Sequence, residues 1–371
     1  MSKYKLGDIC EIVSGSTPKT GVDEYWDGDI KWITPAELND DTYIITDSVR
    51  KITELAVKKT GLSSFPEGTV ILSSRAPIGK VAIAGCEMYC NQGFKNLICS
   101  DKINNRYLYW FLKGNAEYLN SLGRGATFKE ISKSIVSEIE INVPSLNEQA
   151  VVVANLEKIS RIIVLRKQEL FILDNLIKAR FVEMFGNPAL NDKSWEQKSL
   201  GEITSKIGSG ATPKGGKEGY QEEGISLIRS MNVYNGEFEY KDLAHISNEQ
   251  ATKLDNVTLE ENDVLLNITG ASVARSCIVP SRVLPARVNQ HVCIIRCKEY
   301  IVPEFLNKLL IDDNYQSLLW NIAGAGATRE AITKQQVENL QIILPPIELQ
   351  NQFADFVHQV NKSKVVLLSI K

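Results

Sequence analysis

Apolar residues in the middle of the chain recur in steps of three and four, which is the spacing of one face of an α-helix. This pattern runs from Leu146 to Phe185 without a glycine or proline, and Arg166 and Arg180 interrupt it. The apolar seam consists of Val152, Leu156, Ile159, Ile163, Leu170, Leu173, Ile177 and Met184. A seam of this kind is typical of a coiled-coil helix. Gly186-Asn187-Pro188 predicts its end, since glycine caps helices and proline cannot continue them.

On either side of this helix the pattern changes to short apolar runs bounded by turn residues, which predicts strands. The predicted strands are Val70–Leu72, Val81–Ala84 and Leu97–Cys99 in the first half, and Val264–Leu266 and Val292–Ile295 in the second. Each half then has a helical pattern, over Tyr107–Leu119 and near Phe305–Leu319. After Pro345-Pro346 a further helical pattern runs to the end of the sequence and is shorter than the central one.

The two halves also share motifs in the same order. Ser14-Gly15-Ser16-Thr17-Pro18-Lys19 returns as Ser209-Gly210-Ala211-Thr212-Pro213-Lys214, and Leu6-Gly7-Asp8-Ile9 returns as Leu200-Gly201-Glu202-Ile203. Gly125-Ala126-Thr127 returns as Gly326-Ala327-Thr328, and Pro144 with Gln149 returns as Pro345 with Gln350. A period of about 200 residues is the size of a domain and is too long for a solenoid repeat.

The sequence therefore predicts an α+β chain with two similar domains in tandem, separated by long helices. A solitary helix of this length would expose its seam, so we expect the two helices to pair as an antiparallel coiled coil. The predicted boundaries are 1–145 for the first domain, 146–186 for the central helix, 187–345 for the second domain and 346–371 for the short distal helix.

Composition narrows the function without naming it. The formal net charge is −3, from 42 Lys and Arg against 45 Asp and Glu, so a nucleic-acid surface needs segregated charge or a partner. There is no run of eighteen apolar residues and no apolar leader, and we expect no membrane association. The odd number of cysteines, 7, predicts a reducing cytoplasm. We expect no metal, because Cys86/Cys90 and Cys293/Cys297 lack histidines at ligand spacing.

The motifs of several enzyme classes are missing from the sequence. It lacks a phosphate-binding Gly-x-x-x-x-Gly-Lys-Ser/Thr loop, the Asn-Pro-Pro-aromatic tetrapeptide of adenine methyltransferases and the Pro-Asp opening of a restriction-nuclease core. His245, His291 and His358 have no counterparts in the repeat, so a duplicated histidine-based catalytic site is excluded. The chain is therefore expected to have no catalytic residues.

Taken together, the repeated motifs and the Met184-Phe185-Gly186-Asn187-Pro188 helix end resemble the specificity subunits of type I restriction–modification systems. The resemblance covers essentially the whole chain and occurs twice. It implies two target-recognition domains that each read one half of a bipartite site in double-stranded DNA, and helices that set the spacing. It also implies docking to two methyltransferase subunits and to restriction/translocase subunits. S-adenosylmethionine, ATP and magnesium would belong to those partners, and the chain itself would hold no cofactor.

Candidate DNA contacts follow from residue type and position. Arginine and lysine read guanine edges or hold phosphates, and glycine loops offer free amides to phosphate. Because bases should be read by residues that differ between the domains, the repeated Thr-Pro loops are better candidates for phosphate contact or scaffold. The candidates are Ser16, Thr17, Lys19, Arg75, Lys80, Lys95, Arg124 and Lys129 in the first domain, and Thr212, Lys214, Arg229, Arg275, Arg287, Arg329 and Lys334 in the second.

Two other hypotheses remain open at this stage. A helical adaptor that holds protein partners without reading DNA would fit the acidic balance and the long helix, but it leaves the duplicated domains unexplained. A nuclease or fused methyltransferase with an unrecognised site lacks the motifs of such chemistry.

Overall fold

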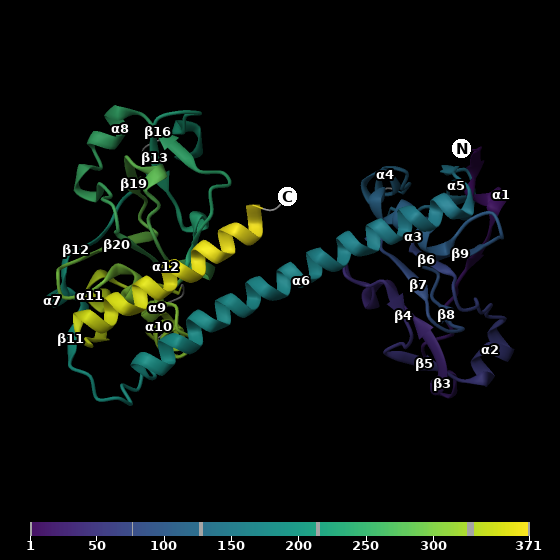
Figure 1. The fold of residues 1–371 in the computed structure, drawn as a ribbon, viewed down its shortest axis with the longest axis horizontal. Helices are drawn as coiled ribbons and strands as arrows, with labels where there is room; N and C mark the ends of the chain where they lie inside the picture. The colour runs from purple at the N-terminus through teal and green to yellow at the C-terminus, as the bar shows by residue number, and fades with distance from the viewer. Residues whose placement is uncertain (1, 76, 126–128, 213–215, 325–329, 370–371) are drawn as a thin grey trace. The chain divides into compact units, whose positions relative to one another are not determined.

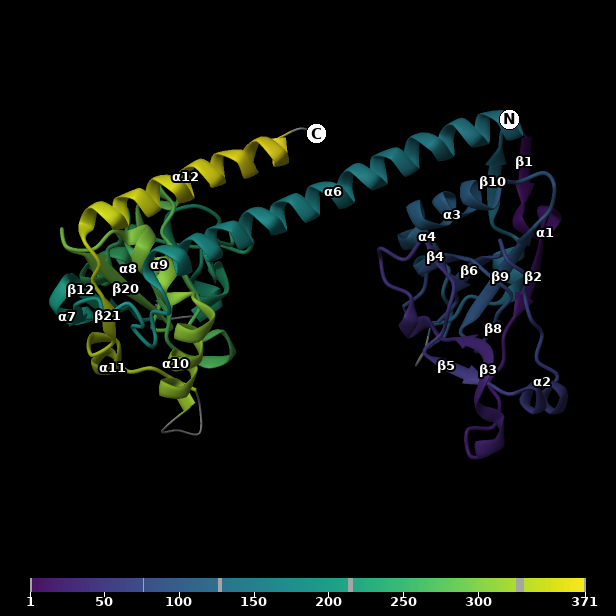
Figure 2. The ribbon, with the colours of Figure 1, turned by 60° about the horizontal axis from the view of Figure 1, so that its bottom comes forward.

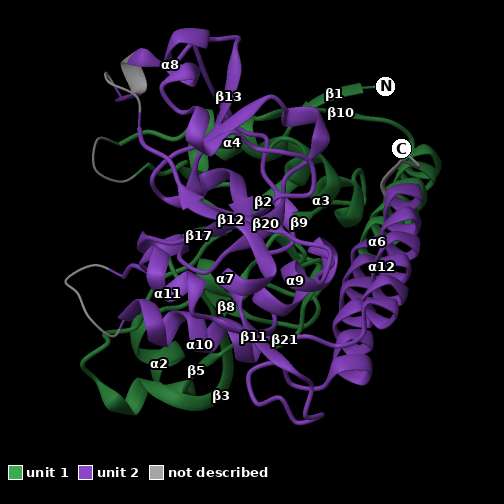
Figure 3. Ribbon diagram, turned by 90° about the vertical axis from the view of Figure 1, so that its left-hand side faces the viewer, with its two compact units in different colours: residues 1–165 green, residues 166–371 purple. Residues whose placement is uncertain are grey.

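The computed structural model describes residues 2–75, 77–125, 129–212, 216–324 and 330–369 (Figure 1). The chain divides into two compact units, Met1–Leu165 and Arg166–Lys371 (Figure 3). The long helix α6, Leu146–Phe185, begins in the first unit and ends in the second. None of the helices in the described ranges is long and apolar enough to span a membrane.

The first unit combines one larger sheet, two small sheets and short helices. Its strands are β1 Ser2–Lys5, β2 Cys10–Ser14, β3 Trp26–Ile33, β4 Ile44–Ile45, β5 Arg50–Ile52, β6 Val70–Ser73, β7 Val81–Ala84, β8 Tyr89–Cys90, β9 Phe94–Cys99 and β10 Glu140–Val143. Its helices before α6 are α1 Leu6–Ile9, α2 Glu54–Thr60, α3 Asn105–Gly114, α4 Ala116–Ser121 and α5 Lys133–Ser137. The sheet orders are β2-β9-β6-β7-β4, β5-β3-β8 and β1-β10.

The second unit repeats this plan. Its strands are β11 Gln197–Ser199, β12 Thr204–Ser209, β13 Ile225–Ile228, β14 Val233–Tyr234, β15 Glu237–Phe238, β16 Ala244–Ile246, β17 Val264–Asn267, β18 Ser276–Ile278, β19 Ala286–Val288, β20 Val292–Cys297 and β21 Gln341–Ile343. Its helices after α6 are α7 Leu200–Ile203, α8 Asn248–Thr252, α9 Pro303–Leu310, α10 Asp313–Gly324, α11 Lys334–Glu338 and α12 Ile347–Ser369. The sheet orders are β12-β20-β17-β18, β16-β13-β19, β11-β21 and β14-β15.

The corresponding strands pair in the same way in both units. Ser14 of β2 lies opposite Lys95 of β9, and Ser209 of β12 lies opposite Cys293 of β20, so each shared loop leaves its sheet at an equivalent place. The strands β6 and β17 then follow in the same antiparallel order. The predicted α+β architecture with two similar units is confirmed.

The part of α6 in the second unit packs antiparallel to α12, and both lie along the same side of that unit (Figures 1 and 2). Asp174 forms an ion pair with Lys364, whereas Phe181, further along α6, contacts Phe353, nearer the start of α12, at a ring separation of 5.4 Å. Phe185 and Phe305 of α9 complete an aromatic cluster in the core of this unit. The predicted pairing of the two helices is therefore confirmed in this stretch.

Two details of the prediction are wrong. Each helix predicted after the strands is divided in two, into α3 and α4 and into α9 and α10. The predicted seam also places Val152 and Ile159 on the packed face, but they are 38% and 54% exposed, and Val153 is buried. Gln149, one turn before Val153, is also buried, so the packed face at the start of α6 passes through these two residues.

The repeated Gln149 and Gln350 have the same structural role. The Gln149 amide donates to the main-chain oxygens of Lys102 and Pro144 and accepts from the Asn104 amide. The Gln350 amide makes three equivalent bonds, to Tyr300, Pro345 and Val302. Both side chains are fully buried, and each ties the first turn of a long helix to its own unit.

Candidate nucleic-acid interface

In each unit the shared Thr-Pro loop is held against an Asn-Gln turn. The Thr17 hydroxyl donates to the Gln92 side-chain oxygen at 2.5 Å, and the Thr212 hydroxyl donates to that of Gln290 at 2.6 Å. An added Cβ at Gly210 would lie 1.8 Å from the main-chain oxygen of Val288, so only glycine fits there. The repetition of these residues therefore has a structural cause.

Two further candidates in the first unit's loop have exposed side chains. Ser16 and Lys19 are exposed side chains. Their main-chain oxygens accept hydrogen bonds from the indoles of Trp32 and Trp26. Lys214 lies outside the described residues.

Lys80 and Arg275 occupy equivalent places on equivalent hairpins. The main-chain oxygen of Lys80 accepts from the Ser73 amide at 2.8 Å, and that of Arg275 accepts from the Asn267 amide at 2.8 Å. Their side chains then diverge. The Lys80 ammonium donates to the main-chain oxygens of Pro35 and Leu38, whereas the Arg275 guanidinium lies 4.5 Å from the ring centre of Tyr234.

An ion-pair group of Lys95, Glu130 and Arg75 lies at the end of the first unit's large sheet, and Lys95 is its buried member. The Lys95 ammonium lies 3.2 Å from a carboxylate oxygen of Glu130, and Arg75 Nε donates to the other oxygen at 2.9 Å. Lys95 is only 6% exposed, while Arg75 is exposed. Burial alone would raise the pKa of Glu130, but the hydrogen bonds and positive charges of Arg75 and Lys95 outweigh it and lower that pKa from its ordinary 4.5.

Two of the second unit's candidate arginines are used in packing. Arg287 is 8% exposed, pairs with Asp255 at 2.7 Å and donates to the main-chain oxygen of Ala251. The Arg229 guanidinium donates to the main-chain oxygen of Asp242 and lies over the ring of Tyr220, with its Nε buried and unpartnered. Lys95, Arg229 and Arg287 therefore each bond to partners within their own unit.

Three further candidates, Arg124, Lys129 and Lys334, have exposed side chains. Arg124 and Lys129 are exposed, and the Arg124 main chain pairs with Glu130. Lys334 is exposed and lies 3.4 Å from Glu338. Arg329 lies outside the described residues.

The hairpin between β17 and β18 forms one wall of a cavity of about 440 Å³, which we call the hairpin cavity. Its polar side chains are Ser230, Tyr234, Thr269, Ser272, Arg275 and His291. Among the described residues, none of those lining it is acidic. Sequence reasoning found only Arg275. The Asn-Gln pair recurs in both halves, as Asn91-Gln92 and Asn289-Gln290. This repeat is a sequence signal that points to His291, which directly follows the second pair.

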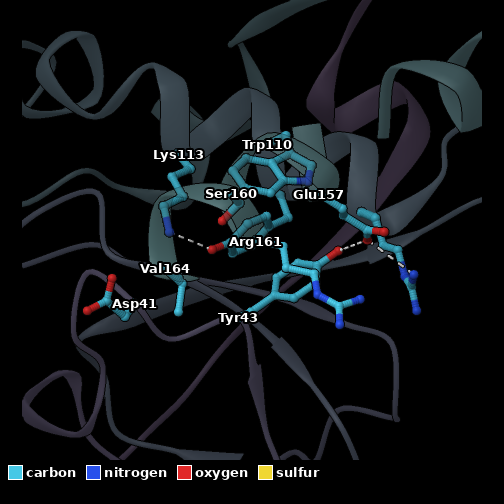
Figure 4. A pocket seen from close by; sticks show the side chains of 10 residues that line it. Asp41, Tyr43, Trp110, Lys113, Glu157, Ser160, Arg161 and Val164 are labelled. Atoms are coloured by element: carbon cyan, nitrogen blue, oxygen red, sulfur yellow. Dashed lines mark hydrogen bonds and ion pairs between the residues drawn. The ribbon is translucent and has the colours of Figure 1, made fainter. Parts of the chain in front are cut away.

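A second cavity, of about 420 Å³, lies in the first unit between α3 and the first half of α6 (Figure 4). Tyr43 and Arg106 both bond to Glu157, and Lys113 donates to the hydroxyl of Tyr109. The Trp110 indole nitrogen is buried without a partner. The aromatic and arginine side chains that line this cavity are of the types enriched at protein interfaces.

Cys90 and Cys293 are buried free thiols. Burial raises the pKa of Cys90 and of Cys293 to about 12, so both thiols are protonated at neutral pH. Within the described ranges, no group of three or more His, Cys, Asp or Glu side chains is placed to hold a metal ion.

Comparison with known proteins identifies the family. The model of the type I restriction modification DNA specificity domain matches residues 1–171 and again 192–368. The chain is 34% identical to the type I restriction enzyme MjaIX specificity subunit of Methanocaldococcus jannaschii, over 98% of this chain and 88% of that protein. It is 24% identical to the EcoBI specificity subunit of Escherichia coli, over 80% of this chain and 68% of that one.

Solved structures show the same fold at low sequence identity. The type I restriction-modification system S subunit from M. genitalium aligns with a TM-score of 0.57 and 14% identity, over 100% of this chain and 93% of that one. A chain from a study of complex assembly and conformational transition of the type I R-M system aligns with a TM-score of 0.60 and 18% identity, over 99% and 91%. With both units matched by one family model, the chain belongs to the family of type I restriction–modification DNA specificity subunits.

Proposed function

We propose that each unit reads one half of a bipartite site in double-stranded DNA, and that α6 and α12 fix the spacing between the halves. One observation carries this proposal: equivalent backbone positions in the two units bear different side chains. Lys80 corresponds to Arg275, and the bridge between Arg75 and Glu130 corresponds to the bridge between Thr269 and Ala331. A shared scaffold with unlike side chains is what two different half-sites require.

The reading surface lies where the hairpin, the Asn-Gln turn and the Thr-Pro loop of each unit meet. In the first unit the exposed Arg75, Arg124 and Lys129 are available to phosphates or bases. In the second unit Arg275 lies at the corresponding hairpin, and Lys334 is exposed. Lys95 and Arg287 do not belong to this surface, because both are less than 10% exposed and paired with carboxylates.

The chain acts as a DNA-reading subunit without catalysis of its own. Two methyltransferase subunits bring S-adenosylmethionine, and restriction/translocase subunits bring the ATP and magnesium. Exposed apolar side chains on α6 support such docking: Ile159, Ile162, Ile163 and Leu165 in the first unit, and Phe171 and Ile172 in the second, are each 47% or more exposed. Apolar patches of this kind mark protein interaction sites.

Selection from randomised duplex DNA tests this proposal. The complex of the chain with its methyltransferase subunit is incubated with the pool, and retained DNA is sequenced over several rounds. We expect two short defined blocks separated by a spacer of fixed length and free sequence. Enrichment of a single block, or of none by a complex that stays assembled, would instead favour a helical adaptor that does not read DNA.

A further inference from the structure

The hairpin cavity differs chemically from the corresponding region of the first unit. Of the residues that the structure describes, one arginine, one histidine and several hydroxyl groups line it, and no carboxylate does. The chain as a whole has a net charge of −3, so the lack of acidic side chains among the described residues of the cavity is a local feature. It suits a ligand that offers hydrogen-bond acceptors.

Arg275 is the side chain in this cavity that is fixed but still has free donors. Its main chain closes the turn after β17, where the preceding Ala274 has a φ of 72°. Its guanidinium lies 4.5 Å from the ring centre of Tyr234, which restricts the side chain without using its N–H groups. Within the described residues, the guanidinium makes no hydrogen bond or ion pair.

The residues around Arg275 are held by a set of side-chain hydrogen bonds. The side-chain nitrogen of Asn267, Nδ2, donates to the main-chain oxygen of Ser230 at 2.8 Å and to the Ser272 hydroxyl at 3.2 Å. His291 lies 2.5 Å from the Thr269 hydroxyl through Nδ1 and 3.1 Å from the Gln290 amide through Nε2. Gln290 in turn accepts from Thr212, so the shared Thr-Pro loop braces the cavity.

The first unit carries different side chains at the positions that correspond to this cavity. Lys80, at the place of Arg275, is bound to main-chain oxygens of its own unit. Gly93 follows Asn91-Gln92 at the place of His291. Contacts that only hold phosphates are needed equally by both halves, whereas contacts that read bases must differ. Arg275 differs from its counterpart Lys80, as expected of a residue that reads a base.

We propose that the hairpin cavity is the base-reading site of the second unit, and that Arg275 reads a guanine edge there with Tyr234 as its positioning residue. The planar fork of arginine matches the O6 and N7 acceptors of guanine in the major groove. Thr269 and Ser272 offer hydroxyl groups beside it. This inference rests on the proposed reading of two half-sites and names one base contact within it.

The test compares two arginines of the same unit that both stack on tyrosine. Arg282 lies 3.5 Å from the ring centre of Tyr240 and does not line the cavity, so Arg282→Ala is the matched control for Arg275→Ala. Each variant, in complex with the methyltransferase subunit, repeats the selection from randomised DNA. We expect Arg275→Ala to lose the preference for one guanine in one half-site by about 10- to 100-fold. The other half-site, and the whole motif of Arg282→Ala, should be unchanged.

Two further variants separate base reading from other causes. Arg275→Lys keeps the charge but loses the fork, so it should bind DNA and still lose the guanine preference. Tyr234→Phe should retain the preference and Tyr234→Ala should weaken it. Replacing that guanine by 7-deazaguanine, which lacks N7, should weaken binding of the unaltered complex and leave Arg275→Ala unaffected.

The proposal has outcomes that would overturn it. Equal weakening of all sequences by Arg275→Ala and none by Arg275→Lys would mean a phosphate contact. An unchanged motif, or loss of guanine preference in both half-sites, would also exclude the assignment. A complex that selects no motif even when unaltered would instead remove the proposed function itself.

Discussion

Single glycines decide whether the shared loops can approach the turns that hold them. Gly15 and Gly210 both lie where a Cβ would meet main-chain oxygen, at 2.2 Å from Cys90 and 1.8 Å from Val288. Backbone cannot move aside as a flexible side chain can. The recurrence of glycine at both places therefore reflects close packing, and a ligand is not needed to explain it.

Gly210→Ala should lower the free energy of unfolding by about 1–3 kcal/mol, because overpacking forces the loop away from Val288. Gly208→Ala is the matched control, since nothing lies within 4 Å of a Cβ there. Denaturant unfolding of both variants checks this. Equal stability of the two variants would contradict the packing account.

The carboxyl of Glu130 makes the first unit sensitive to acid. Its pKa is lowered in the folded state, so its contribution to stability is present above the unfolded value of about 4.5 and is lost as pH falls through the lower folded value. Glu130→Gln should destabilise the unit at pH 7 by about 1–3 kcal/mol, since the Lys95 ammonium loses its charged partner.

The same substitution should also flatten the decline in stability below pH 4.5, measured as unfolding midpoints across a pH series. Glu138→Gln, which removes the exposed pair with Lys5, is the control. If the stability of Glu130→Gln declined with acid as steeply as that of the unaltered chain, Glu130 would not be the titrating group.

Residue-scale features could be predicted only in part from the sequence. The repeated glycine, threonine and glutamine positions marked the loops and helix starts, because the same local geometry was needed twice. The burial of Lys95 and Arg287 could not be foreseen. Their carboxylate partners, Glu130 and Asp255, lie 35 and 32 residues away, and only the folded chain brings them together.

At the scale of elements, the long helix α6 was the best predicted part of the chain. Its bounds follow from the absence of glycine and proline and from Gly186, which has a φ of 76° and ends the helix. Its packed face was predicted less well near the start. Gln149 is buried on that face, and the predicted seam was built from apolar residues only. The exposed Ile163 remains available to a partner.

Ile163→Glu should reduce co-purification of the methyltransferase subunit while leaving the thermal unfolding midpoint unchanged, because the side chain is already 51% exposed. Ala154→Glu provides the control. It adds the same charge to an exposed position nine residues earlier, which lies about 180° away around the helix. Undiminished co-purification of Ile163→Glu would place the docking surface elsewhere.

For the molecule as a whole, the near balance of charge limits what the chain can do alone. The first unit exposes Arg75, Arg124 and Lys129 on its loops, and the partner subunits are expected to supply further phosphate contacts. Affinity of the assembled complex for DNA should therefore fall by about a thousandfold or more between 50 and 200 mM salt, as for about six phosphate contacts. Filter binding across a salt series measures this. Salt-independent binding would contradict a phosphate-based interface.

The duplication of the fold was evident from the sequence, whereas the identity of each half-site was not. Two copies of one motif order predict two copies of one scaffold, and the sheets bear this out. Base reading depends on how side chains such as Arg275 and Tyr234 lie beside one another, and residues 41 positions apart have no detectable relation in the sequence alone.

The central claim, that this chain alone supplies a two-part DNA specificity, is tested most directly by sequencing modified bases. Genomic DNA is compared from cells that express the methyltransferase subunit with and without this chain. We expect one bipartite motif, methylated on both strands, that appears only when the chain is present. A stable complex that adds no methylation, or that methylates a single uninterrupted sequence, would contradict the account.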